Sequence, residues 1–480
     1  MGNRSGTDRY RLLTPPESHR LARVPDPAAR TPGVGSPFRS EASDRSGVTD
    51  LCRFDPWEAT SIQAWYHGAI SMRGRHSRPL VVRPRVTLRR AAPWIGVLLL
   101  VAVLGSALIM EAHREITDPG DSDAIALVTG GRLVVSDPSH LFSPVAQERT
   151  EARLLHIPAD DHFIAPFTNI AAGALLLSPL AGSNLWVASE ITVLASTLLF
   201  ALALLLEFRW LAPVSSRPVQ LAIVVAAVMN IPAVEAIVQW DSLMTVALLG
   251  SVLLAERRRY GWAGVLLATL ILKPQVLWLV VPALVAARSW RYLAGFLLGS
   301  VGWIVVSLVV TGPNGFVALV QLMARIYPGQ SDSSIGLPSL VSAVTGSGEA
   351  GFIAAGCLGA IAAALLLWRR DALRGQPVAA VGVGLVLSLL CSPHVTGEDL
   401  MLVAVPIALI ARRWPLLALI EAIAISAVEI VQLQLPPSAQ HLQPFMLAVI
   451  AASTFLAVIP MTPSTMTYSP TRVRLLLHRS

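Results

Sequence analysis

The chain has very little cysteine and almost no lysine. Its 480 residues include three cysteines, Cys52, Cys357 and Cys391, whose spacing fits neither a disulfide framework nor a zinc motif. Arginine supplies 36 of the 37 basic residues, so Lys273 is the single lysine. Charged residues make up only 14% of the sequence. Such a shortage of charge excludes an ordinary soluble protein of this length.

Apolar residues take the place of the missing charge. They account for 54% of the sequence, and the mean hydropathy is +0.61. A helix that crosses a bilayer needs about 20 mostly apolar residues, and runs of that kind recur after residue 91. We therefore predict an all-α polytopic membrane protein with about 12 transmembrane helices. We place it in the plasma membrane with both termini in the cytoplasm.

The two ends of the chain are polar. Residues 1–90 hold 16 arginines against eight acidic residues without sustained periodicity, which predicts a disordered basic cytoplasmic tail. This charge fits contact with anionic lipid, and no nucleic-acid partner is expected. Met72 offers a second start position, and no signal-peptide pattern predicts cleavage. Residues 91–462 are predicted to form the membrane domain, and residues 463–480 a cytoplasmic C-terminal tail.

Arginine-rich loops prefer the cytoplasmic side, and this rule orders the predicted spans. Residues 111–165 carry ten acidic residues and four arginines, so they are predicted to form a large extracytoplasmic loop. Residues 167–180 are short for a span, and the parity of the crossings requires them to re-enter or lie at the interface. Residues 311–338 are predicted as a second outer loop. The spans themselves are Pro93–Met110, Asn184–Leu206, Val219–Val238, Asp241–Ala255, two short helices within 256–291, Tyr292–Val310, Gly351–Trp368, Pro377–Leu390, Leu400–Ala411, Pro415–Leu433 and Phe445–Ile459.

Lys273 lies in the middle of an apolar run with arginines at both ends, from Glu256 to Arg291. A charge at the bilayer centre costs about 2.5 to 3.5 kcal/mol, so such residues usually face a cavity or a ligand. Both arginine groups reach the cytoplasmic side if the run is a hairpin with Lys273 and Pro274 at an outer apex. Pro274 disfavours helical geometry at the residue before it, which fits an apex. The alternative is a lysine that snorkels from one kinked helix.

Several short strings resemble glycosyltransferase family 87, whose members use polyprenol-phosphate sugars and belong to the C-type membrane glycosyltransferases. They cover most of residues 93–415, and their order and spacing carry the resemblance. The strings are GDSDAIALVTGGRLVVSDPSHLFSPVAQ from Gly120, VQWDSL from Val238, AGVLLATLILKPQ from Ala263 and CSPHVTGEDLMLVAVP from Cys391. Aromatic residues expected after the first acid are replaced by Ala126 and Leu127, which bears on acceptor preference.

The resemblance implies transfer of a sugar, often mannose, from a polyprenyl-phosphate donor to a lipid or glycan acceptor, with inversion. Such a displacement needs a carboxylate that takes the acceptor proton and a cation near the leaving phosphate. Asp123 aligns with the opening-loop acid and is the candidate base, with Asp121 as second candidate. The alternative is that both aspartates cap a helix beginning near Ala124. Lys273 is the candidate for the donor phosphate, and Gln275 for its orientation or that of the sugar.

Four further polar residues are candidates for substrate binding. Gln239 and Asp241 border an apolar segment, where they are costly unless paired, so interhelical hydrogen bonding is the alternative role. His394 and Asp399 lie at the predicted outer ends of spans, and for His394 an interfacial position without substrate contact is the alternative. No metal motif is present beyond Asp121 and Asp123, so we predict no cofactor and leave divalent metal open.

Two other classes of function fit a multi-span protein with charges inside the membrane. A secondary transporter or lipid flippase also needs such charges, but no inverted repeat is visible, and transporters seldom carry a long acidic loop after the first span. A catalytically silent scaffold is the third reading, supported by the missing aromatic residues after Asp123.

Overall fold

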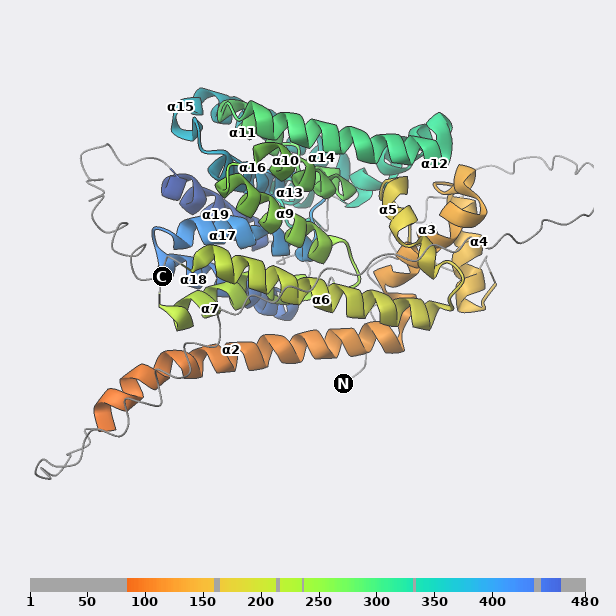
Figure 1. The fold of residues 1–480 in the computed structure, drawn as a ribbon. Coiled ribbons are helices and arrows are strands. Elements are labelled where there is room, and N and C mark those ends of the chain that lie inside the picture. The colour runs from red at the N-terminus through yellow and green to blue at the C-terminus, as the bar shows by residue number, and fades with distance from the viewer. Residues whose placement is uncertain are drawn as a thin grey trace, which may run out of the picture. The chain divides into compact units, whose positions relative to one another are not determined.

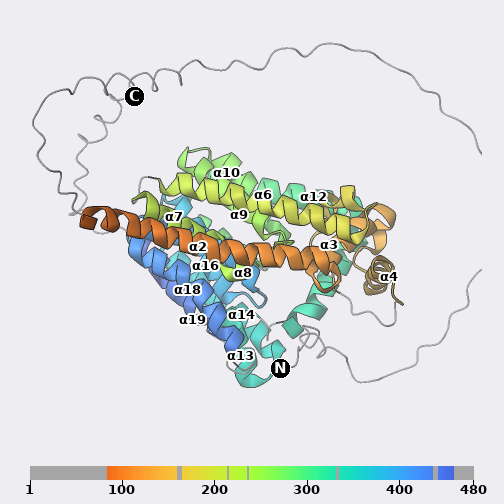
Figure 2. The same cartoon turned by 90° about the horizontal axis from the view of Figure 1, so that it is seen from below.

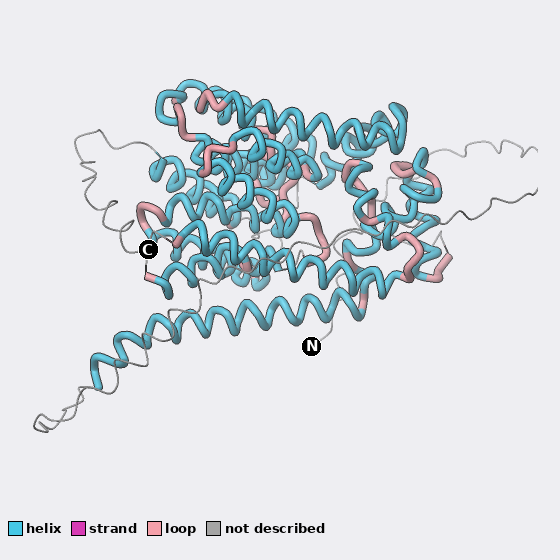
Figure 3. The backbone as a smooth tube through the Cα atoms, in the orientation of Figure 1, coloured by secondary structure: helices cyan, strands magenta, loops and turns pink. Residues whose placement is uncertain are grey.

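The structure is a computed structural model, and it describes residues 84–158, 165–212, 216–234, 237–330, 334–435 and 442–458. Every regular element within these ranges is a helix (Figure 3). The predicted disorder of residues 1–83 and the C-terminal tail of residues 463–480 lie outside them. Residues 84–90, the basic end of the predicted tail, belong to the first described helix, α2 (Pro84–Thr117).

The predicted extracytoplasmic loop is folded. It contains η5 (Pro119–Asp121), α3 (Asp123–Ser136), η6 (Pro138–His140) and α4 (Pro144–Leu155). Ser122 caps α3 and Ser143 caps α4, each accepting a hydrogen bond from a backbone N–H of the first turn. Figures 1 and 2 show α3 and α4 together at one end of α6. The segment continues with α5 (Ala171–Leu176) and η8 (Ser178–Leu180). A six-residue helix is about 9 Å long and cannot cross a bilayer.

The remaining helices alternate between long spans and short broken segments. Five helices are long and apolar enough to cross a membrane, beginning at Ala91, Leu185, Trp290, Gly348 and Pro415. Five apolar helices of 10 to 17 residues accompany them, four between the long helices and one after the last, so the count of 12 spans stays a prediction. The elements are α6 (Leu185–Leu211), α7 (Arg217–Val228), α8 (Ile231–Val234), α9 (Asp241–Glu256), α10 (Tyr260–Leu267), η9 (Ala268–Leu272), η10 (Pro274–Val276), α11 (Val280–Ala286), α12 (Trp290–Gln330), α13 (Leu337–Thr345), α14 (Gly348–Trp368), α15 (Arg370–Leu373), α16 (Pro377–Cys391), η12 (Gly397–Val403), α17 (Ala404–Ala411), α18 (Pro415–Gln434) and α19 (Gln443–Val458).

The run around Lys273 forms the expected hairpin. Helix α10 packs against the start of α12 so closely that a Cβ on Gly264 would lie 2.1 Å from the Tyr292 carbonyl oxygen. Gly261 lies against Gly295 in the same interface, and α12 starts only a few residues after α11 ends. The two helices α10 and α11 therefore run in opposite directions, with Lys273 where they meet.

The arginine-rich turns gather at the end of the bundle away from the apex. Arg412 pairs with Glu256, whose carboxylate also accepts a hydrogen bond from the Trp210 indole at 2.8 Å. The Gly375 N–H donates to the Ala287 carbonyl at 3.0 Å, which joins the turns after α11 and α15. These contacts agree with the positive-inside ordering of the loops, while the side of the membrane on which this end lies stays a prediction.

Residues 311–338 differ from the predicted outer loop. Helix α12 continues to Gln330 and is interrupted only at Gly312, with φ 71° and ψ 173°. This backbone conformation lies in the region that favours glycine, and Pro313 follows it directly. The sequence Thr-Gly-Pro-Asn-Gly therefore marks a kink at which two helices meet, in place of a long loop. Helix α12 contacts η6 and α5, and its Ser307 hydroxyl accepts a hydrogen bond from the Ala172 N–H of α5 at 3.1 Å, so it packs on the folded segment.

Candidate active site

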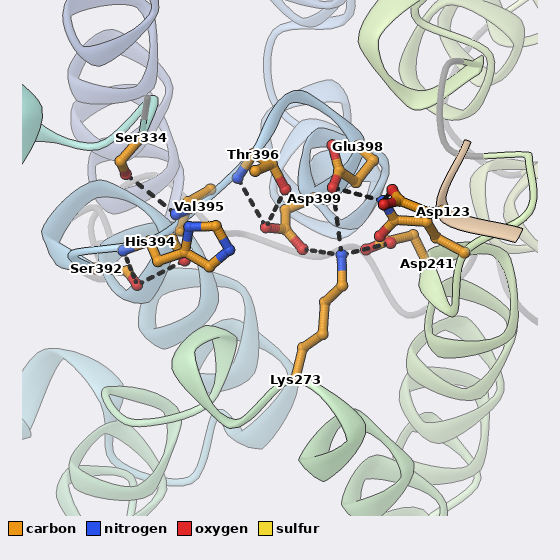
Figure 4. A network of polar contacts seen from close by, with 11 residues as sticks. Asp123, Asp241, Lys273, Ser334, Ser392, His394, Val395, Thr396, Glu398 and Asp399 are labelled. Atoms are coloured by element: carbon orange, nitrogen blue, oxygen red, sulfur yellow. Dashed lines mark hydrogen bonds and ion pairs between the residues drawn. The ribbon is translucent and has the colours of Figure 1, made fainter. Parts of the chain in front are cut away.

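Lys273 is the centre of a cluster of charged side chains at the apex of the hairpin (Figure 4). Its ammonium nitrogen lies 2.7 Å from Asp241 Oδ2 and 3.1 Å from Asp399 Oδ1, and both contacts are hydrogen bonds. Glu398 Oε1 lies 3.8 Å away, within ion-pair distance but beyond a hydrogen bond. Lys273 is only 8% exposed, so these acids compensate a charge that is shielded from water.

Local structure places each of these acids. Asp241 is the first residue of α9, where the helix dipole favours a negative charge. Asp399 belongs to a capping box at the start of η12, because its second oxygen accepts the Thr396 backbone N–H at 3.0 Å. The Asp399 carboxylate therefore caps the start of η12 and also binds Lys273. Glu398 is its neighbour in the chain and is partly exposed.

Asp123 is connected to this cluster through Gln239. The Gln239 amide nitrogen donates to Asp123 Oδ2 and also to Glu398 Oε1, the latter at 2.9 Å. Asp123 does not cap α3, since Ser122 does so by accepting the Ala124 N–H at 3.1 Å. The capping role that the sequence left open for this aspartate thus belongs to its neighbour, and the Asp123 carboxylate turns toward Gln239.

The cluster changes from exposed to buried across a short distance. Asp123 is exposed, Gln239 and Glu398 are intermediate, and Asp241 and Asp399 are buried. Part of the Asp123 side chain is exposed, but the surrounding protein desolvates its carboxylate. This desolvation raises the pKa of Asp123, and the negative charge of Glu398 raises it further, while the Lys273 charge acts in the opposite direction.

The acids outnumber the ammonium group. Four carboxylates and one lysine share the network, so it is anionic when all are ionised. The second oxygen of Asp241, Oδ1, is buried and has no hydrogen-bond partner among the described residues. An unpaired carboxylate oxygen in a buried position favours a donor group such as a sugar hydroxyl. The described residues contain no group of histidine, cysteine, aspartate and glutamate suited to hold a metal ion.

Most of the candidate site residues come together in this network. Asp123, Gln239, Asp241, Lys273 and Asp399 are all connected by the contacts above. Figure 4 also shows His394, on the opposite side of Asp399 from Asp123. Its backbone exchanges hydrogen bonds with the Ser392 hydroxyl, which fixes the loop before η12.

Three residues differ from this pattern. Gln275 lies in η10, two residues after Lys273, and its buried Oε1 has no partner among the described residues. The side chain of Asp121 lies outside the described part of the chain. Glu398 was missed as a site residue although it adjoins Asp399 in a string that had been singled out. Its role depends on a contact across 159 positions with Gln239, which spacing alone does not reveal.

Apolar helices of membrane length together with a charged network at a hairpin apex define a membrane protein with a polar site between its helices. Residues 167–393 match the family model of Glycosyltransferase family 87. This match confirms, over these residues, the resemblance seen in the sequence, and the family implies a membrane glycosyltransferase. The match includes Gln239, Asp241 and Lys273. The chain matches no curated protein and no solved structure.

Proposed function

We propose that the protein transfers mannose from a polyprenyl-phosphate donor to a hydroxyl of a lipid or glycan acceptor at the outer face of the plasma membrane. The observation that carries this proposal is the continuous network from Asp123 to Lys273. It joins an exposed carboxylate of the folded loop to a cation at the hairpin apex. An inverting transfer needs these two groups on opposite sides of one sugar.

In the proposed reaction Asp123 is the general base. Its carboxylate takes the proton of the acceptor hydroxyl as the acceptor oxygen bonds to the anomeric carbon. The bond from this carbon to the phosphate oxygen breaks at the same time, and polyprenyl phosphate leaves with the electron pair. Gln239 is a positioning residue, since its amide fixes the carboxylate through a hydrogen bond. Because the attack comes from the face opposite the phosphate, the configuration inverts.

Lys273 is the proposed contact to the donor phosphate. Two of its three N–H groups bind Asp241 and Asp399, and the third is directed toward neither of them. A phosphate oxygen would take this third donor, in place of the long contact with Glu398. Asp241 would bind a sugar hydroxyl through its open oxygen. Gln275, His394 and Asp399 complete the proposed substrate contacts.

The negative surplus of the network constrains this proposal. A phosphodiester adds one more negative charge beside four carboxylates, which repels the donor unless a proton neutralises one acid. Asp123 has the raised pKa that favours proton uptake in the resting site. This proton must leave to solvent before Asp123 can take the acceptor proton, so turnover should increase as the pH rises through the raised pKa of Asp123.

The test is transfer from radiolabelled polyprenyl-phosphate mannose by the purified full chain, with candidate glycan and lipid acceptors. We expect Asp123→Asn to lower turnover by about 100-fold or more, because a general base contributes about 10² to 10⁴ in rate. Asp137→Asn is the matched control. Asp137 is an exposed aspartate of the same loop that pairs with His140 at 2.8 Å and makes no contact with the network.

Full turnover by Asp123→Asn would remove this residue from the mechanism. The transfer assay with wild-type protein is also run in sealed vesicles. Movement of the labelled lipid across the bilayer without any product would identify a transporter or flippase and refute the transferase assignment.

A further inference from the structure

A cavity with two arginines in its lining lies at the far end of α3 from Asp123. It has a volume of about 360 Å³. Its lining includes Arg132 and Ser136 of α3, Thr150 and Arg153 of α4, and Gly182 after η8. Arg132 follows Asp123 by nine positions on the same helix, which is about 13 Å along its axis. The cavity is therefore separate from the charged network around Lys273.

Both arginines of this cavity are held in place by the surrounding protein. An Arg132 Nη2 donates to the Ser183 carbonyl at 2.6 Å. Arg153 donates through Nη2 to the Thr150 hydroxyl at 3.1 Å and through Nε to the Arg149 carbonyl at 3.0 Å. These bonds fix the guanidinium groups before any ligand binds. The Nε of Arg132 is buried and has no hydrogen-bond partner among the described residues.

No acid within the described ranges neutralises these two groups. Neither Arg132 nor Arg153 forms an ion pair with a described carboxylate. Burial lowers the pKa of Arg132, and the positive charge of Arg153 lowers it further. Two fixed guanidinium groups of like charge beside one cavity cost free energy unless an anion lies between them. The planar fork of arginine suits a phosphate, which it binds through two parallel hydrogen bonds.

Apolar side chains are exposed in the lining of the cavity and on α5, a short helix that contacts α3. Val135 lines the cavity and is 60% exposed, and Leu175 and Leu176 of α5 are also exposed. Exposed apolar side chains next to a fixed cationic group are what a lipid with a charged headgroup contacts. We propose that Arg132 and Arg153 bind the phosphate group of a membrane lipid headgroup at the end of α3. This site is independent of the proposed transfer, because it contains none of the residues assigned to it.

The test is equilibrium binding to the purified full chain in a neutral detergent. The probes are dioctanoyl phosphatidic acid, glycerol 3-phosphate, which lacks the chains, and dioctanoylglycerol, which lacks the phosphate. We expect phosphatidic acid to bind tightly, glycerol 3-phosphate more weakly and dioctanoylglycerol not measurably. The double variant R132Q/R153Q should bind phosphatidic acid at least about tenfold more weakly, since charge-assisted hydrogen bonds to phosphate are lost.

Arg149→Gln is the matched control, because it removes the same charge one turn from Arg153 and outside this cavity. It should bind nearly as well as the wild type. If R132Q/R153Q fails to fold, as judged by its thermal unfolding, Arg153→Gln alone decides, since Arg153 is exposed. Equal binding by wild type and the arginine variants would overturn the site. Equal affinity for glycerol 3-phosphate and phosphatidic acid would overturn the lipid assignment.

Discussion

Replacement of Lys273 by methionine tests whether the charged network stabilises the membrane domain. At an effective dielectric constant of about 20, contacts of 2.7 and 3.1 Å correspond to Coulomb attractions of roughly 5 to 6 kcal/mol each. Desolvation of the buried ions offsets much of this attraction. Breaking a buried pair by removing one partner costs about 3 to 5 kcal/mol, because it leaves an uncompensated charge. We therefore expect Lys273→Met to lose about that much stability at pH 8.

The loss should depend on pH with a definite sign. Without the ammonium group, Asp241 and Asp399 face each other and Glu398, and uptake of a proton by one of them relieves the repulsion. The destabilisation should therefore be smaller at pH 5 than at pH 8. Denaturant and thermal unfolding of the full chain in detergent measure it. The double variant K273M/D241N should be more stable than K273M. If Lys273→Met were as stable as the wild type at pH 8, the charged network would not stabilise the membrane domain.

Three further predictions concern the site and the hairpin. First, kcat/KM should rise with pH along an acidic limb that lies above the usual range of aspartate, because the pKa of Asp123 is raised and a base must be ionised. Second, Gln239→Leu should lower kcat/KM about 10- to 100-fold, since two charge-assisted hydrogen bonds are lost. Third, Gly264→Val should destabilise the protein by about 3 kcal/mol or more, because its Cβ would lie 2.1 Å from a backbone oxygen.

Each of these has an outcome that contradicts it. A pH limb at the position of an unperturbed aspartate argues against Asp123 as the titrating base. Transfer by Gln239→Leu at the wild-type rate would show that the amide does not position the carboxylate. For the hairpin, Gly261→Ala is the control, because a Cβ there meets no atom within 4 Å. If Gly264→Val and Gly261→Ala lower the free energy of unfolding by the same amount, the close approach of α10 and α12 does not explain the destabilisation.

The sequence was most informative where charge interrupts apolar runs. A single lysine between two arginine groups predicted the hairpin, because burial of charge and loop orientation leave few arrangements. The helix after Gly312 was harder to predict, because the Gly-Pro pair that ends one helix is followed directly by a second helix and not by a loop. Glu398 and the bridging role of Gln239 depend on contacts between segments more than 100 positions apart. Such contacts are fixed by packing and not by local pattern.

Because the chain has one lysine, the burial of Lys273 has a practical consequence. Reagents that modify amines have a single side chain to react with, and its ammonium group is in contact with Asp241, Asp399 and Glu398. The rate of that reaction reports how often Lys273 leaves its contacts with Asp241 and Asp399. Because Lys273 carries the single side-chain amine, acylation of side chains measures the accessibility of this residue without an engineered label.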